Sequence, residues 1–150
     1  MSVRVDFYVV AATDSGADER ARTACRLAER AWKAGHRVFV LSGNAQAARQ
    51  LDELMWTFRQ NSFVPHALVE GPEASTGPDL DATPVWLGSD SVPDVANDVL
   101  INLTDDVPLT YARFNRVAEI IAGSDDTRAA GRTRFRFYRE HDCDVHTHNL

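Results

Sequence analysis

Arginine is concentrated in one segment near the end of the chain. The segment 127–140, TRAAGRTRFRFYRE, contains five arginines and one glutamate, a net charge of +4. The whole chain carries −6, which leaves −10 outside this segment. If the segment is helical, one broad face carries Arg128, Arg132, Phe135, Arg136 and Arg139. Guanidinium groups around an aromatic ring suit an anion that also carries an apolar group.

Three interpretations fit this arginine segment. It can bind an acidic peptide that ends in a hydrophobic residue with a free carboxylate. It can instead bind a single nucleic-acid strand through phosphates and stacked bases. The third interpretation is a solvated helix face that pairs with Asp and Glu elsewhere on this acidic protein. The sequence pI of about 5.3 excludes a protein that is basic all over, and therefore disfavours bulk nucleic acid.

A second group of residues suited to binding is aromatic. Trp56, Phe58 and Phe63 cluster at a predicted helix end and the loop after it. Such residues are favoured anchors of protein–protein interfaces, and Pro65 stiffens the loop and favours an extended Phe63. The alternative is that these rings fill the core against a sheet.

Catalytic patterns are weak in this sequence. The first predicted strand–helix turn, residues 11–16, lacks both GxGxxG and the GxxxxGK[ST] loop that cradles phosphates. Ser62 and His66 lie four residues apart, but Pro65 intervenes and no orienting acid lies nearby. We therefore expect no catalytic residues and no cofactor.

The end of the chain holds potential metal ligands. The segment 141–148, HDCDVHTH, offers three His, one Cys and two Asp, yet their spacing fits no established zinc pattern. Chain ends are also poorly ordered in most domains. The sequence therefore predicts no metal site. Cys25 and Cys143 form no motif and no disulfide framework.

Alternating β and α patterns must position these groups. Strands are predicted at Val3–Val10, Arg37–Leu41, Pro84–Leu87 and Asp98–Leu103. Helices are predicted from about Asp18 to Ala34, where Gly35 ends the helix, and from about Asn44 to Trp56.

Further along the chain, the spacing predicts one more helix before the arginine segment. Thr110 would cap it, and its apolar face would carry Phe114, Val117, Ala118 and Ile121. Gly123 breaks this helix before the last segment, and the Gly- and Pro-rich stretch 70–83 reads as a loop. The pattern predicts one α/β domain over residues 1–150, with a mostly parallel, Rossmann-like sheet flanked by helices.

Length and composition agree with this class. A chain of 150 residues buries a sizeable core without disulfides. No run approaches 18 consecutive apolar residues, so no membrane-spanning helix is expected, and the start of the chain lacks a signal-peptide layout. We expect a cytoplasmic protein.

Several motifs together resemble a known family, the chi subunit of bacterial DNA polymerase III. The most specific combination is Leu51-Asp52-Glu53-Leu54-Met55-Trp56 followed by Ser62-Phe63-Val64-Pro65-His66. The other matching segments are Val5–Tyr8, Ala28–Val38, Asp98–Leu103 and Arg132–Arg139. They occur in order and span nearly the whole chain.

The resemblance implies a non-catalytic accessory subunit of the clamp-loader complex. Chi-like proteins bind the psi subunit, or a repair helicase, on one surface, which corresponds here to Trp56 and Phe63. On another they bind the acidic, Phe-ended tail of single-stranded-DNA-binding protein, which corresponds to Ile121, Arg128, Arg132 and Phe135. In the family, Lys can replace Arg128 and Tyr can replace Phe135. Arg128 keeps the positive charge of that Lys. Phe135 keeps the aromatic ring of that Tyr but lacks its hydroxyl.

Two other hypotheses remain open from the sequence. One is direct binding of single-stranded nucleic acid through the arginines, whereas the resemblance implies contact with nucleic acid only through partners. The other is a nucleotide-using enzyme on a Rossmann-like sheet, which the missing phosphate loops disfavour.

Overall fold

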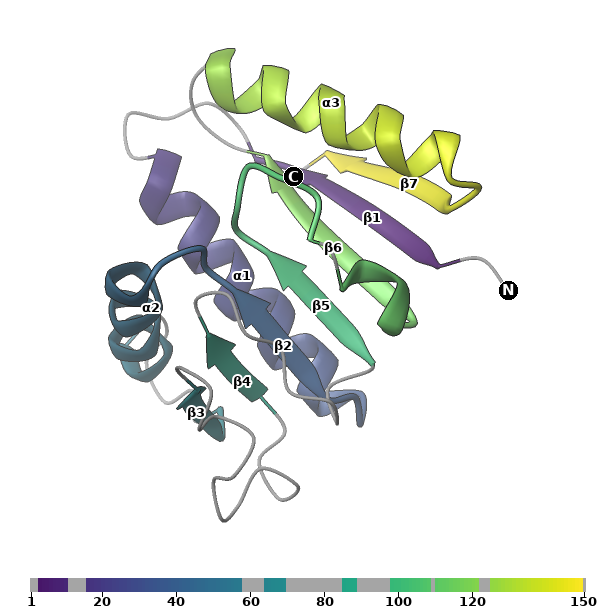
Figure 1. The fold of residues 1–150 in the computed structure, drawn as a ribbon. Helices are drawn as coiled ribbons and strands as arrows, with labels where there is room; N and C mark the ends of the chain where they lie inside the picture. Colours follow the sequence, from purple (N-terminus) through teal and green to yellow (C-terminus); the bar gives the residue numbers. More distant parts are fainter. Residues whose placement is uncertain are drawn as a thin grey trace.

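The fold is built on a parallel sheet of seven strands (Figure 1). The computed structural model describes residues 3–10, 16–57, 64–69, 85–88, 98–108, 110–121 and 125–149. The strands are β1 (Arg4–Val9), β2 (Val38–Leu41), β3 (His66–Val69), β4 (Val85–Gly88), β5 (Val99–Asn102), β6 (Arg116–Ile121) and β7 (Asp144–Asn149). Their order is β3-β4-β2-β5-β6-β1-β7, and every pair is parallel. This confirms the predicted α/β class.

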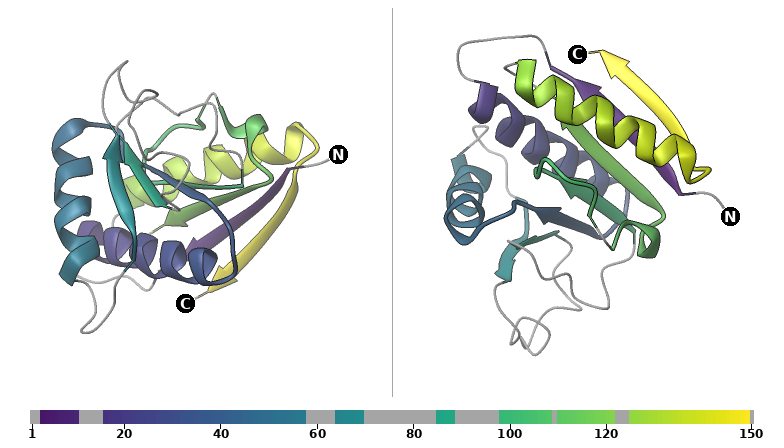
Figure 2. Two further views of the ribbon diagram at one scale, coloured as in Figure 1. Left: turned by 90° about the horizontal axis from the view of Figure 1, so that it is seen from below. Right: turned by 45° about the horizontal axis from the view of Figure 1, so that its top comes forward.

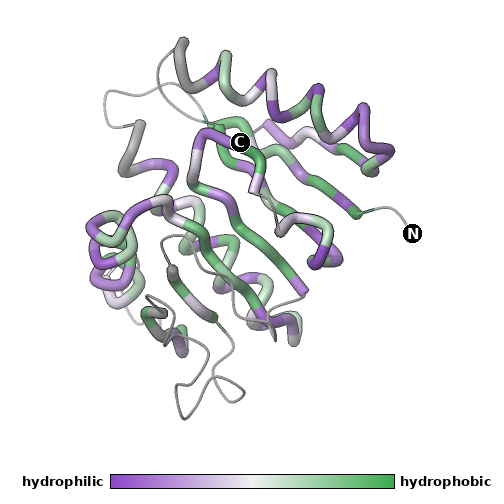
Figure 3. Tube along the Cα trace, in the orientation of Figure 1, coloured by the Kyte–Doolittle hydropathy of each residue, from purple (hydrophilic) through white to green (hydrophobic). Residues whose placement is uncertain are grey.

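Helices cover both faces of the sheet. α1 (Gly16–Lys33) and α2 (Ala45–Thr57) lie on one face, and α3 (Asp125–Glu140) lies on the other (Figures 1 and 2). Side chains of β1 therefore alternate between two apolar clusters: Tyr8 packs on the α1 side and Phe7 on the α3 side. Apolar residues dominate the central strands (green in Figure 3), as expected when both faces are buried.

The first two predicted helices are confirmed, with the expected end residues. Gly35 follows α1 with a φ of 91°, a conformation that glycine adopts without steric cost. Asn44 precedes α2, and its Oδ1 accepts a hydrogen bond from the Ala47 N–H at 2.8 Å. The strands predicted around Val3–Val10, Arg37–Leu41, Pro84–Leu87 and Asp98–Leu103 correspond to β1, β2, β4 and β5.

The predicted helix after Thr110 is wrong. Thr110 precedes a short 3₁₀ helix, Tyr111–Arg113, without a side-chain cap, and the chain then enters β6. β6 lies between β5 and β1, and its residues from Val117 to Ile120 are all buried. A strand buried on both faces has apolar residues at many spacings, so the helical spacing was coincidental.

The sequence prediction also missed two strands at opposite edges of the sheet. β3 begins at His66, and β7 forms from the His-rich end, which pairs with β1 along six residues. The buried carboxylate of Asp6 holds this edge: its Oδ1 lies 2.9 Å from His148 Nε2, and its Oδ2 accepts from Arg116 Nε at 2.7 Å. The expectation of a poorly ordered end is therefore wrong, because backbone pairing and Asp6 fix it.

The described residues contain no group of three or more His, Cys, Asp or Glu side chains that could hold a metal ion. In the same part of the chain, no helix combines the length and hydropathy that spanning a bilayer requires. The predicted loop 70–83 lies outside the described residues.

Candidate interaction surfaces

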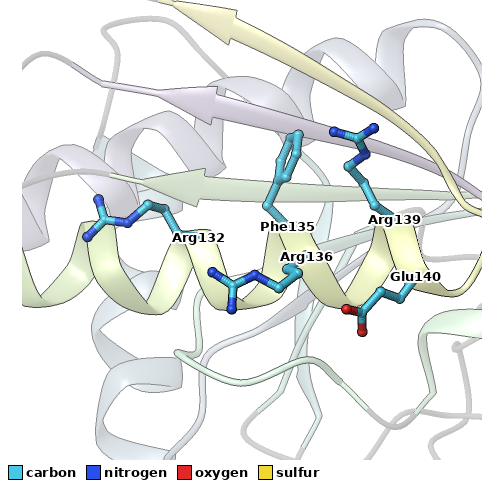
Figure 4. A pocket seen from close by; sticks show the side chains of 5 residues that line it. All are labelled: Arg132, Phe135, Arg136, Arg139 and Glu140. Atoms are coloured by element: carbon cyan, nitrogen blue, oxygen red, sulfur yellow. The ribbon is translucent and has the colours of Figure 1, made fainter.

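A shallow pocket of about 550 Å³ lies on the outer side of α3 (Figure 4). Its lining consists of Arg132, Phe135, Arg136, Arg139 and Glu140. These positions are spaced i, i+3, i+4, i+7 and i+8, so one helix face carries them all. Phe135 and Arg139 point to the same side of α3, whereas Glu140 points away from them. We call this group the α3 pocket.

Phe135 supplies the apolar part of the α3 pocket. It is partly buried, and its ring centroid lies 5.3 Å from that of Phe7 on β1. The guanidinium carbon of Arg139 lies 5.9 Å from the centre of the Phe135 ring, within cation–π range. The ring is thus held from below by the core, and its remaining surface faces the pocket.

A buried ion pair fixes the orientation of α3. The side chains of Arg134 and Glu119 are almost completely buried, and Arg134 Nε donates to Glu119 Oε1 at 3.0 Å. Glu119 also accepts from the Tyr138 hydroxyl at 2.7 Å and from Asn102 Nδ2 at 3.0 Å. Burial raises the pKa of Glu119, while Arg134, Asn102 and Tyr138 act in the opposite direction. Because Arg134 turns inward, the arginines on either side of it turn outward.

Ile121 lies at the end of β6, against α3. A Cβ atom added at Gly131 would lie 2.5 Å from Ile121 Cδ1, so the helix approaches this side chain as closely as a glycine allows. Ile121 and Phe135 both pack against the apolar cluster on the α3 side of the sheet. Neither Ile121 nor the exposed Arg128 lines the α3 pocket.

The site residues predicted from the sequence therefore cover only part of the α3 pocket. Arg132 and Phe135 line it, but Arg136, Arg139 and Glu140 were not named as site residues. Their helical spacing from Arg132 could have identified them, because the sequence already placed Arg136 and Arg139 on the same face.

Trp56 lies at the other predicted site, in the last turn of α2. With 49% of its surface exposed, it is the most exposed large hydrophobic side chain in the part of the chain that the structure describes. Leu51 and Met55, from the same Leu51–Trp56 motif, are buried in the core. The motif therefore contributes side chains both to the core and to the surface. Phe58 and Phe63 lie outside the described residues, as does Ser62.

The ring of His66 on β3 packs against Trp56, with 4.5 Å between the ring centroids and 54° between the planes. His66 Nδ1 donates to the Val64 carbonyl at 2.7 Å, and Nε2 lies 3.1 Å from Asp52 Oδ1. The described partners of His66 are thus a backbone carbonyl, a carboxylate and an indole.

Another pocket, of about 440 Å³, lies between α1, α2 and the ends of β2 and β5. Crevices in this position bind nucleotides in many open α/β sheets. Arg20 is the cation among its described lining residues. Its Nε donates to the Ile120 carbonyl at 3.2 Å, and its Nη1 lies 3.7 Å from Asp105. Because Arg20 is engaged by the protein itself, this pocket gives no support to a phosphate site.

Comparisons with known proteins identify close relatives. The family model described as "DNA polymerase III chi subunit, HolC" matches residues 1–146. A protein of Pseudomonas aeruginosa named DNA polymerase III subunit chi is 40% identical over 147 residues, which cover 98% of this chain and 96% of that relative. The protein of the same name from Haemophilus influenzae is 28% identical over 153 positions, covering 100% of this chain and 99% of the relative.

Similarity of fold extends further. The crystal structure of T4 UvsW matches with a TM-score of 0.73 and 9% identity, covering 99% of this chain and 41% of that one. At this identity the match shows a shared fold alone. The family match confirms the resemblance that the sequence motifs indicated.

Proposed function

This chain belongs to the family of the DNA polymerase III chi subunit, a replication accessory subunit, and we propose that it acts as a cytoplasmic, non-catalytic adaptor with two binding surfaces. The α3 surface binds the acidic, Phe-ended tail of single-stranded-DNA-binding protein. The surface around Trp56 binds the psi subunit or, as an alternative partner, a repair helicase.

The α3 pocket carries the first half of this proposal. Its three arginines flank one phenylalanine ring, so cations and an apolar surface lie within one open pocket. An acidic peptide with a terminal aromatic residue needs both features. Arginine offers carboxylates a bidentate fork, and the Phe135 ring offers an apolar contact for the terminal side chain.

Within this surface we assign roles to the predicted residues. Arg132 and the exposed Arg128, one helical turn before it, hold the terminal carboxylate and the nearest acidic side chain. Phe135 contacts the peptide ring, and Ile121 forms the apolar wall where β6 meets α3. The exposed charges make the binding sensitive to salt.

A fluorescence polarisation titration tests the tail site, with a labelled peptide that has several Asp residues and a C-terminal Phe. We expect Arg132→Ala to weaken binding about tenfold or more, because a hydrogen bond to a charged group is lost. Amidation of the peptide terminus should cause a similar loss. Arg22→Ala is the matched control, since Arg22 is exposed on α1, across the sheet. If Arg132→Ala binds as tightly as the Arg22→Ala control, the assignment is wrong.

The exposure of Trp56 supports the proposed binding of psi or a helicase at this surface, because tryptophan is frequently a hot spot of protein–protein interfaces. Pull-down from native lysate should show that Trp56→Ala loses psi or the helicase and retains single-stranded-DNA-binding protein. Arg132→Ala should show the reverse pattern. A single set of partners lost by both variants would contradict two separate surfaces.

Direct binding of single-stranded nucleic acid through α3 is the alternative. Glu140 in the pocket and the net charge of −6 both weaken it. A gel shift with an oligonucleotide and the purified protein alone separates the two: binding by wild type that is lost in Arg132→Ala would favour nucleic acid.

A further inference from the structure

The motif that combines Asp52, Trp56 and His66 has an arrangement that the proposed contact through Trp56 does not by itself explain. Asp52 and Trp56 lie on α2, whereas His66 lies on β3, ten positions after Trp56. The three side chains meet at one point of the surface. Trp56 is half exposed, whereas the side chain of His66 is fully buried beneath it and that of Asp52 is one-third exposed.

The His66 ring is held by its burial and by a hydrogen bond to the backbone. Its side chain is fully buried, and because a carbonyl oxygen can only accept, Nδ1 carries the proton in its 2.7 Å contact with Val64. The Nε2 atom faces Asp52 at 3.1 Å, without the alignment of a hydrogen bond. Nε2 gains an attraction to this carboxylate only when it is protonated as well, so the contacts that hold the ring are the Val64 hydrogen bond and the surrounding packing.

An exposed indole on a helix end has several rotamers available, and a partner that needs one of them must select it from the others. Packing on a fixed ring reduces the conformational entropy that the indole would lose when the partner binds. Such preorganisation raises affinity without adding a contact. The centroid distance of 4.5 Å lies within the range in which aromatic pairs attract.

We propose that His66 is a positioning residue of the partner site: its buried ring, fixed by the Val64 carbonyl, holds the Trp56 indole in the orientation that the partner receives. This inference rests on the proposed function of the Trp56 surface. It gives His66 a role that requires no contact between this residue and the partner.

The order of the Trp56 indole can be measured without any partner. The chain has three tryptophans, so three indole N–H signals are expected in a ¹⁵N spectrum, and Trp56→Phe identifies the relevant one. ¹⁵N relaxation should show that the Trp56 indole is ordered in the wild type. It should become markedly more mobile in His66→Ala, while the signal of the buried Trp86 stays unchanged.

Binding to the purified psi subunit is then measured by calorimetry. We expect His66→Ala to weaken binding about three- to tenfold, the value of one aromatic pair. His66→Phe, which keeps a ring under the indole, should recover most of both the order and the affinity. Glu53→Gln, at an exposed acid on α2, is the control and should change neither the order of the indole nor the affinity.

The outcomes distinguish this inference from the proposed function on which it rests. If Trp56→Ala loses psi binding but His66→Ala leaves indole order and affinity unchanged, His66 does not position Trp56, and the partner surface stands. If Trp56→Ala binds psi like the wild type, both ideas are overturned. His66→Phe keeps a buried ring, so an indole that becomes mobile in this variant would also contradict the inference, even if His66→Ala does not fold.

Discussion

At the scale of the residue, burial decides which arginines are available to a partner. Arg134 is almost fully buried and donates to Glu119, whereas Arg132 and Arg136, two positions away on either side, are exposed. All three belong to the same run of sequence and carry the same charge. The inward arginine holds the helix to the sheet, and the outward arginines face solvent.

We expect Arg134→Ala to lower the free energy of unfolding by about 3–5 kcal/mol, because it leaves the Glu119 charge buried and unpaired. Arg136→Ala, an exposed control, should change it by less than about 0.5 kcal/mol. Urea denaturation followed by circular dichroism measures both values. Equal stability of the two variants would mean that the Arg134–Glu119 pair does not hold α3.

Asp6 should make stability depend on acid pH. Burial raises the pKa of Asp6, but hydrogen bonds from His148 and Arg4 and the charge of Arg116 lower it more, so its folded pKa lies below the ordinary value. Its contribution is therefore present above the unfolded pKa of about 4 and is lost as pH falls through the folded pKa.

Stability measured by urea denaturation between about pH 6 and pH 2 should thus fall less steeply in Asp6→Asn than in the wild type, although the variant is less stable at neutral pH. Asp144→Asn, on the exposed carboxylate nearby in β7, serves as the control. Parallel curves for Asp6→Asn and the wild type would contradict the role of Asp6.

At the scale of the element, α3 comes close to the sheet where Gly131 meets Ile121. A helix normally loses stability at an internal glycine, by about 1 kcal/mol relative to alanine. Here the missing Cβ makes room for the Ile121 side chain at the end of β6, so the close packing of α3 on the sheet offsets the low helix propensity of glycine.

Gly131→Ala should therefore destabilise the protein by about 1–3 kcal/mol despite its better helix propensity, because it overpacks Ile121. Combining it with Ile121→Val, which removes the Cδ1 atom that Cβ would meet at 2.5 Å, should recover much of the loss. A double-mutant cycle from thermal denaturation measures this coupling, and additive effects would contradict the predicted contact.

At the scale of the whole molecule, the two proposed surfaces lie on opposite faces of the sheet. α3 covers one face, and α2, whose last turn carries Trp56, lies on the other (Figure 1). Between them, apolar clusters pack on both faces of the sheet. Surfaces separated in this way and sharing no residue should act independently.

We expect the protein saturated with psi to bind the acidic peptide with the affinity of the free protein, within about a factor of two. Fluorescence polarisation with and without psi measures this ratio. A larger change in affinity would reveal coupling through the sheet.

The sequence by itself determined what local spacing can encode. The arginine face of α3, the ends of α1 and α2, four of the strands and the family motifs are all visible in spacings of a few residues. Arg132 and Phe135 could be assigned to one helix face because that face depends only on the 3.6-residue period.

Only the tertiary structure decided which segments pair and which charges are buried. Residues 116–121 became a central strand and the His-rich end became β7 because partners distant in sequence offered hydrogen bonds and burial on both faces. The same pairing brought Glu119 beneath Arg134 and His66 beneath Trp56. Such contacts join residues from different elements, so no local period records them. The structure therefore added Arg136, Arg139 and Glu140 to the lining of the pocket around Arg132 and Phe135, and it showed that His66 packs against Trp56.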